Sequence, residues 1–128
     1  MARENFEIIT NNPLVLGKLE KTHYVAYHEI SYEEILKKVR DRIHEGHRLL
    51  SHPLSGSVKP KETPYKSIII TKRKEMKPDL ESLELIENAI EACGKFSFKA
   101  DLYGAEVYKD FQLIDWTLLK SALESAEI

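Results

Sequence analysis

Polar and cationic side chains that could hold a small anion are concentrated in one loop, at residues 51–60. Ser55, Gly56 and Ser57 could turn successive backbone N–H groups toward an anion, with the two hydroxyls and Lys59 as further donors. Three prolines restrict the backbone in and after this loop: Pro53, Pro60 and Pro64. The pattern predicts a phosphate or carboxylate cradle. Its alternative is a tight turn in which the serines bond their own backbone.

A second group of donors lies near the start of the chain, at Asn11 and Asn12. Asn12 is a favourable N-cap and Pro13 suits the first position of a helix. An anion at this point would meet the positive end of a helix dipole. The sequence has neither a Walker motif nor a GxGxxG motif. The residue types therefore predict that the ligand is an anion but do not identify it.

His52 is a candidate general acid or base, because histidine titrates near neutral pH. Such a histidine needs a carboxylate to orient it or a nucleophile beside it. Glu62 and Ser55 are the nearest residues of those types after it in the sequence. The alternative is a histidine whose hydrogen bond simply holds the loop.

Several other chemistries find little support in the residues. His44 and His47 are separated by Gly46, which interrupts a helix, and no cysteine or acidic cluster completes a metal shell. Cys93 falls on an apolar helical stripe, as a buried thiol would. The formal net charge of −2 provides no positive field for nucleic acid. We expect no metal and no cofactor.

Length and composition predict one domain spanning residues 1–128. A chain of 128 residues with 42% hydrophobic and 31% charged residues is ordinary for a globular protein with one core. No apolar run approaches the length of about 20 residues that a membrane span needs. The first residues lack the layout of a signal peptide, and a single cysteine excludes an internal disulfide. These features predict a cytoplasmic protein that does not bind membranes.

Hydrophobic periodicity and capping residues predict alternating strands and helices. The expected strands are Phe6–Thr10, His23–Tyr27, His47–Ser51 and Tyr65–Thr71. The expected helices are Pro13–Leu19, a helix from the Ser31 capping box to Gly46, Pro78–Cys93 and Lys109–Ala126. The inner line of the last helix is predicted to be Phe111, Ile114, Leu118 and Ala122. Residues 96–108 are ambiguous and could hold an edge strand.

This order predicts the α/β class: a single small domain with an open, mostly parallel sheet of four to five strands flanked by helices. Such sheets bind ligands at the carboxyl ends of their strands. If the strands Phe6–Thr10 and His47–Ser51 are neighbours, the two donor-rich loops that follow them face each other. The ligand would then lie between these loops.

The wording of three segments resembles the GrdX family. These segments are Thr10-Asn11-Asn12-Pro13, the run Ser51–Pro60 that begins Ser-His-Pro-Leu-Ser-Gly-Ser, and Glu62–Ile68. The resemblance covers about the first 75 residues. It implies a small protein encoded among the genes of glycine, sarcosine and betaine reductase systems, with no established reaction. The shared motif includes the candidate ligand-binding positions Asn11, Asn12, His52, Ser55, Gly56, Ser57, Lys59 and Lys66.

Three hypotheses for the function follow from the residues and the resemblance. The first is an accessory protein that binds a small anionic ligand, such as a glycine-derived or phosphorylated compound. The second is a small enzyme that uses His52 as a general acid or base. The third is a non-catalytic protein that docks on a reductase subunit. A homo-oligomer is compatible with the sequence, since small α/β domains often pair.

Overall fold

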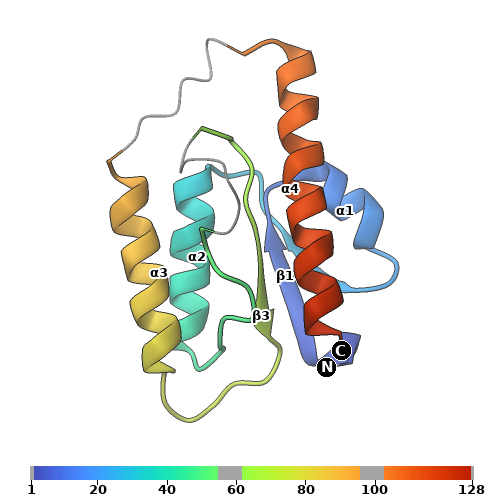
Figure 1. The fold of residues 1–128 in the computed structure, drawn as a ribbon. Helices are drawn as coiled ribbons and strands as arrows, with labels where there is room; N and C mark the ends of the chain where they lie inside the picture. The colour runs from blue at the N-terminus through green and yellow to red at the C-terminus, as the bar shows by residue number, and fades with distance from the viewer. Residues whose placement is uncertain (1, 55–61, 96–102, 128) are drawn as a thin grey trace.

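A three-stranded sheet lies at the centre of the protein in a computed structural model, which describes residues 2–54, 62–95 and 103–127 (Figure 1). The strands are β1 (Phe6–Thr10), β2 (Tyr24–Tyr27) and β3 (Ser67–Thr71), in the order β2-β1-β3. The pair β1–β2 is parallel and the pair β1–β3 is antiparallel. Thr10 pairs with both Tyr27 and Ser67, so β1 and β2 end at the edge where β3 begins.

Four α-helices and one short 3-10 helix complete the described elements. They are η1 (Arg3–Asn5), α1 (Pro13–Leu19), α2 (Tyr32–His44), α3 (Leu80–Cys93) and α4 (Ala105–Ala126). The predicted caps are confirmed: Asn12 accepts from the Leu14 N–H, and Ser31 and Glu34 form a capping box. Gly46, just after α2, has φ of 114°, and a Cβ there would clash with the Glu75 carbonyl oxygen. Among these helices, none is long and apolar enough to cross a membrane.

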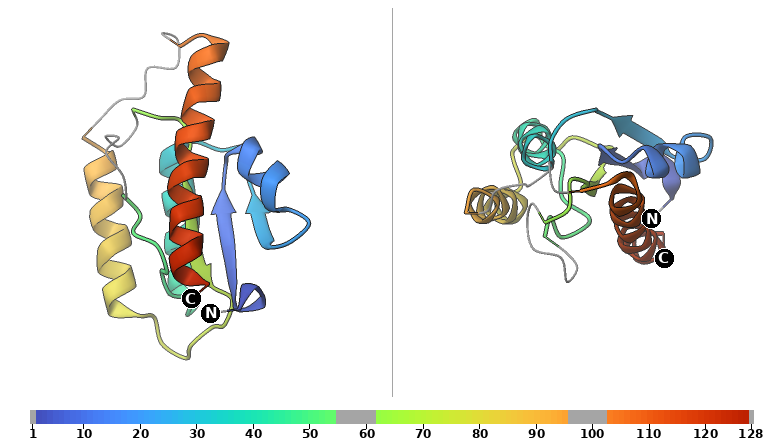
Figure 2. Two further views of the ribbon diagram at one scale, coloured as in Figure 1. Left: turned by 45° about the vertical axis from the view of Figure 1, so that its right-hand side comes forward. Right: turned by 90° about the horizontal axis from the view of Figure 1, so that it is seen from above.

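The helices cover both faces of the sheet, with α2 and α3 on one side and α1 and α4 on the other (Figure 2). Ile9, Ile68 and Ile70 pack against α2 and α3. Phe6, Ile8 and Ile69 pack against α1 and α4. Every residue of β1 is buried, including the polar residues Glu7 and Thr10, because helices cover both faces of this strand.

The predicted sheet of four to five mostly parallel strands is not confirmed. The described residues form three strands, with one parallel and one antiparallel pair. The pair β1–β3 is antiparallel because β3 begins at the edge of the sheet where β1 ends and runs in the opposite direction. The mixed α/β class itself is confirmed.

The segment His47–Ser51 is not the strand that the sequence predicted. Leu49 makes only an isolated antiparallel bridge, to Ile70. Side-chain hydroxyls replace the backbone acceptors that a longer ladder would use: Thr71 Oγ1 accepts from the Arg48 N–H and Ser51 Oγ accepts from the Ile69 N–H. The segment lies beside β3, so β3 separates it from β1 and the assumed adjacency was wrong.

The last helix begins at Ala105 rather than Lys109, and it presents a different face to the core than predicted. Its buried residues are Asp115, Leu119 and Leu123, whereas Ile114 is 41% exposed. The inner line is therefore shifted by one position. Tyr103–Tyr108 fall partly in α4 and form no edge strand, and residues 96–102 lie outside the described residues.

Candidate ligand-binding site

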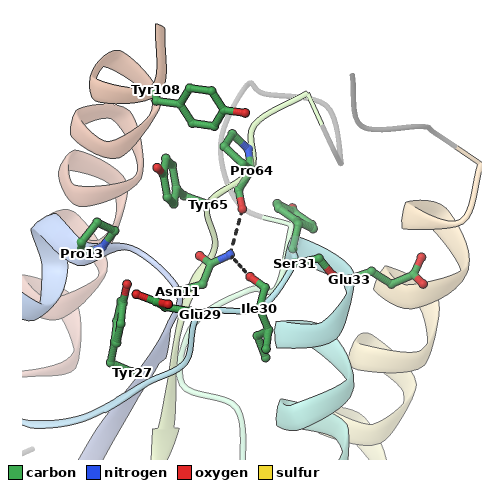
Figure 3. Close-up of a pocket in the computed structure, with 11 residues that line it drawn as sticks. Asn11, Pro13, Tyr27, Glu29, Ile30, Ser31, Glu33, Pro64, Tyr65 and Tyr108 are labelled. Atoms are coloured by element: carbon green, nitrogen blue, oxygen red, sulfur yellow. Dashed lines mark hydrogen bonds between the residues drawn. The ribbon is translucent and has the colours of Figure 1, made fainter. Parts of the chain in front are cut away.

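A pocket of about 350 Å³ opens at the edge of the sheet where β1 and β2 end (Figure 3). Its walls come from the turns after β1 and β2, the first turn of α2, the segment before β3 and the first turn of α4. The lining residues are Asn11, Pro13, Tyr27, Glu29, Ile30, Ser31, Tyr32, Glu33, Pro64, Tyr65 and Tyr108. We call this cavity the tyrosine pocket, because four of these residues are tyrosines.

Two of the tyrosines form a corner of the pocket. The rings of Tyr65 and Tyr108 meet edge to face, with centroids 6.4 Å apart and an interplanar angle of 78°. Gln112 Nε2 donates a hydrogen bond to the Tyr65 hydroxyl at 2.9 Å, which holds the Tyr65 ring against α4. Contacts within the protein therefore hold the Tyr65 and Tyr108 rings against each other and against α4.

Glu29 brings a negative charge to the pocket. Its side chain is exposed, and within the described part of the chain its carboxylate has no hydrogen bond and no ion pair. Figure 3 shows it between the side chains of Tyr27 and Asn11. Partial burial, the Glu29 charge and Tyr65 together raise the pKa of Tyr27, so the Tyr27 hydroxyl stays neutral.

Glu33 also lines the pocket but its carboxylate is directed elsewhere. It points away from the cavity in Figure 3 and forms an ion pair with Lys37, one helical turn later, at 3.4 Å. Glu29 and Glu33 are thus two carboxylates at one pocket with different surroundings.

Asn11 ties together three of the segments that frame the pocket. Its Nδ2 donates to the carbonyl oxygens of Ile30 at 2.9 Å and Pro64 at 2.8 Å. Its Oδ1 accepts from the Lys66 N–H at 2.9 Å. Since both ends of this amide are occupied, Asn11 shapes the pocket more than it offers free donors.

A buried polar network lies behind the pocket and joins β1, β3 and α4. One carboxylate oxygen of Asp115 accepts from Ser67 Oγ at 2.7 Å and from Asn12 Nδ2 at 2.9 Å. The hydroxyls of Thr10 and Ser67 lie 2.6 Å apart. Burial raises the pKa of Asp115, although these hydrogen bonds and the nearby Lys66 oppose the change. We refer to Thr10, Asn12, Ser67 and Asp115 as the Asp115 network.

Lys66 lies between the network and the pocket. It is 6% exposed, and its Nζ lies 5.9 Å from the centre of the Tyr32 ring. Within the described part of the chain, Nζ has no hydrogen bond or ion pair. Burial lowers the pKa of Lys66 to about 8, with the Asp115 charge acting in the opposite direction. Lys66 and Asp115 line a small hollow of about 20 Å³, room for one water, whose wall of Tyr32 and Tyr65 is shared with the pocket.

The structure brings three of the predicted site residues together: Asn11, Asn12 and Lys66 lie at the same edge of the sheet. His52 is exposed, its Nδ1 accepts from the Leu54 N–H at 3.0 Å, and it does not line the tyrosine pocket. Ser55, Gly56, Ser57 and Lys59 lie outside the described residues. The roles assigned to these residues stay predictions.

The sequence analysis missed most of the pocket lining. Tyr27 is the last residue of β2 and Glu29 lies two positions after it, so the rule that directed attention to Asn11 after β1 also applies to them. Tyr65 and Tyr108 come from distant segments, and no local signal joins them. The sequence analysis did not identify Asp115 as a buried residue, because an acidic residue on a helix is usually exposed to solvent.

The fold and site define a small three-layer α/β protein with a ligand-sized pocket at one edge of its sheet. The family model described as GrdX-like protein matches residues 7–124. The chain belongs to the GrdX-like protein family. No match to it was found among curated proteins or among solved structures.

Proposed function

We propose that this protein is an accessory protein of glycine, sarcosine and betaine reductase metabolism that binds a small ligand with an anionic group in the tyrosine pocket. Membership of the GrdX-like family supports the metabolic association. The binding role is supported by the pocket itself, whose volume of about 350 Å³ lies at the lower end of the range for small-molecule sites.

The main observation in favour of an anionic group on the ligand is that the start of α2 forms part of the pocket wall. Ser31 and Tyr32 line the cavity, and Ser31 Oγ accepts only from the Glu34 N–H among the described residues. The N–H of Tyr32, in the first turn, has no intrahelical acceptor and none elsewhere in the described part of the chain. A free N–H at the positive end of a 13-residue helix favours a carboxylate or phosphate. The buried cation Lys66 stands behind Tyr32 and adds to this potential.

Substitution of Ser31 tests this binding role without removing the helix cap. Ser31→Asp keeps a good N-cap but places a carboxylate where the anionic group would bind, and Ser31→Thr is the neutral control. Glycine, acetate, phosphate and acetyl phosphate are titrated by calorimetry. We expect at least one to bind, Ser31→Asp to weaken it about tenfold, and Ser31→Thr to leave it nearly unchanged. Binding of none of them, or equal affinity for both variants, would contradict the proposal.

A further inference from the structure

We infer that the ligand of the tyrosine pocket also carries an ammonium or N-methylated ammonium group, so that it is a small zwitterion. This inference rests on the proposed function and names the chemical class of its ligand. Three features of the pocket carry it: the Glu29 carboxylate, the tyrosine rings and the short distance between the two charged ends.

Glu29 is the first feature. A ligand with only negative charge would meet an exposed carboxylate that has no cation beside it in the described part of the chain. Like charges at close range repel, whereas an ammonium group would supply the missing partner. Glu33, the other carboxylate at this pocket, already has Lys37 as its partner and points away. Of the two carboxylates at this pocket, Glu29 is therefore the one available to pair with a cationic group of the ligand.

The tyrosine rings are the second feature. Tyr27, Tyr32, Tyr65 and Tyr108 line one small cavity, and the last two form a perpendicular corner. The negative faces of aromatic rings attract cations, and rings gathered around a cavity are the usual site for quaternary ammonium groups. The protein already uses this attraction at two places: Lys66 over Tyr32 and Lys72 over Tyr24, the latter at 4.1 Å.

The third feature is the short spacing of the two charged ends. Glu29 and Tyr32 are three positions apart, which limits the separation of their Cα atoms to about 11 Å even for an extended chain, and both residues line the same small cavity. A ligand that fits a cavity of about 350 Å³ and reaches both residues would carry its cation and its anion close together. Amino acids and N-methylated amino acids have this arrangement.

Two pairs of probes isolate the contribution of the cation. Betaine is compared with 3,3-dimethylbutanoate, and glycine with propanoate. The two compounds of each pair have the same size and the same carboxylate, and they differ only in that carbon replaces the positively charged nitrogen. Calorimetric titration of the full chain should show that each zwitterion binds at least about tenfold more tightly than the carboxylate of the same shape that lacks the ammonium group. Glu29→Gln should remove most of that difference, and the matched control Glu33→Gln should retain it.

The outcomes separate this inference from the proposed function. If each carboxylate binds as tightly as its zwitterion, the inference is overturned while the pocket remains an anion site. If choline, which lacks the carboxylate, binds as tightly as betaine, the ammonium site is supported and the anionic part of the proposed function fails. If neither zwitterion binds, the inference is overturned. Retention of the full difference in Glu29→Gln would overturn the role of Glu29.

Discussion

The tyrosine pocket and the Asp115 network lie side by side at one edge of the sheet, yet the polar groups of the network have hydrogen-bond partners and those of the pocket include two that have none among the described residues. In the network, Asp115 on α4 accepts hydrogen bonds from Asn12, the N-cap of α1, and from Ser67 on β3. In the pocket, the Glu29 carboxylate and the Tyr32 N–H have no partner in the described part of the chain. Burial with partners indicates a structural role, whereas polar groups that lack a partner at the wall of a pocket indicate a binding role. Each substitution below tests this division.

The largest effect is expected from Asp115→Ala. The substitution leaves the Ser67 hydroxyl and the Asn12 amide without their acceptor and leaves Lys66 buried without a nearby opposite charge. Breaking a buried charged network by removing one partner costs about 3–5 kcal/mol of unfolding free energy. Urea denaturation measures this, with exposed Asp110 on the same helix as control. Equal unfolding midpoints for Asp115→Ala and Asp110→Ala would show that the network contributes little.

A pH dependence is expected from Lys66. Between its lowered pKa of about 8 and the ordinary value of 10.5, the unfolded chain binds more protons at this residue than the folded protein does. The unfolding free energy of the native protein should therefore rise with pH across this window, relative to Lys66→Met. The limiting gain is about 3 kcal/mol.

Denaturation of both proteins at pH 7, 8, 9 and 10 measures this difference, because the other titrating groups are common to both. A difference that stays constant from pH 7 to pH 10 would mean that the Lys66 ammonium is not desolvated. An NMR titration of the Lys66 side chain would give the same pKa directly.

The smallest effect on stability is expected from Glu29→Gln. Glu29 is exposed and makes no hydrogen bond or ion pair with the described residues, so its neutral counterpart should change the unfolding free energy by less than about 0.5 kcal/mol. The same variant should lose affinity for a zwitterion. Thermal unfolding without ligand supplies the comparison. A clear loss of stability would place Glu29 among the structural residues and remove the contrast between the two regions.

Local signals in the sequence were enough to predict part of this edge of the protein. The apolar run of β1, the Asn12 cap of α1 and the Ser31 capping box all depend on neighbours within a few residues, and each is confirmed. The arrangement of β3 could not be predicted in this way. Its antiparallel pairing with β1 depends on contacts between residues about 60 positions apart.

The inward position of Asp115 illustrates the same limit. Periodicity placed Ile114 and Leu118 on the inner line of α4, because apolar residues usually face the core. The structure turns the helix so that Asp115 meets Ser67 and Asn12, and Ile114 is 41% exposed as a result. A buried carboxylate is recognisable only when its partners are known. The tyrosine pocket likewise combines segments that no local pattern connects.

The central claim is that the tyrosine pocket binds a small zwitterion while the Asp115 network holds the fold. Amide chemical shifts of the labelled full chain, recorded during titration with glycine and with betaine, test it most directly. We predict saturable shifts centred on Tyr27–Glu33 and on Tyr65, with much smaller changes at Leu119 and Leu123 in the core. Absence of saturable shifts with both compounds, or shifts centred away from the pocket, would contradict the account.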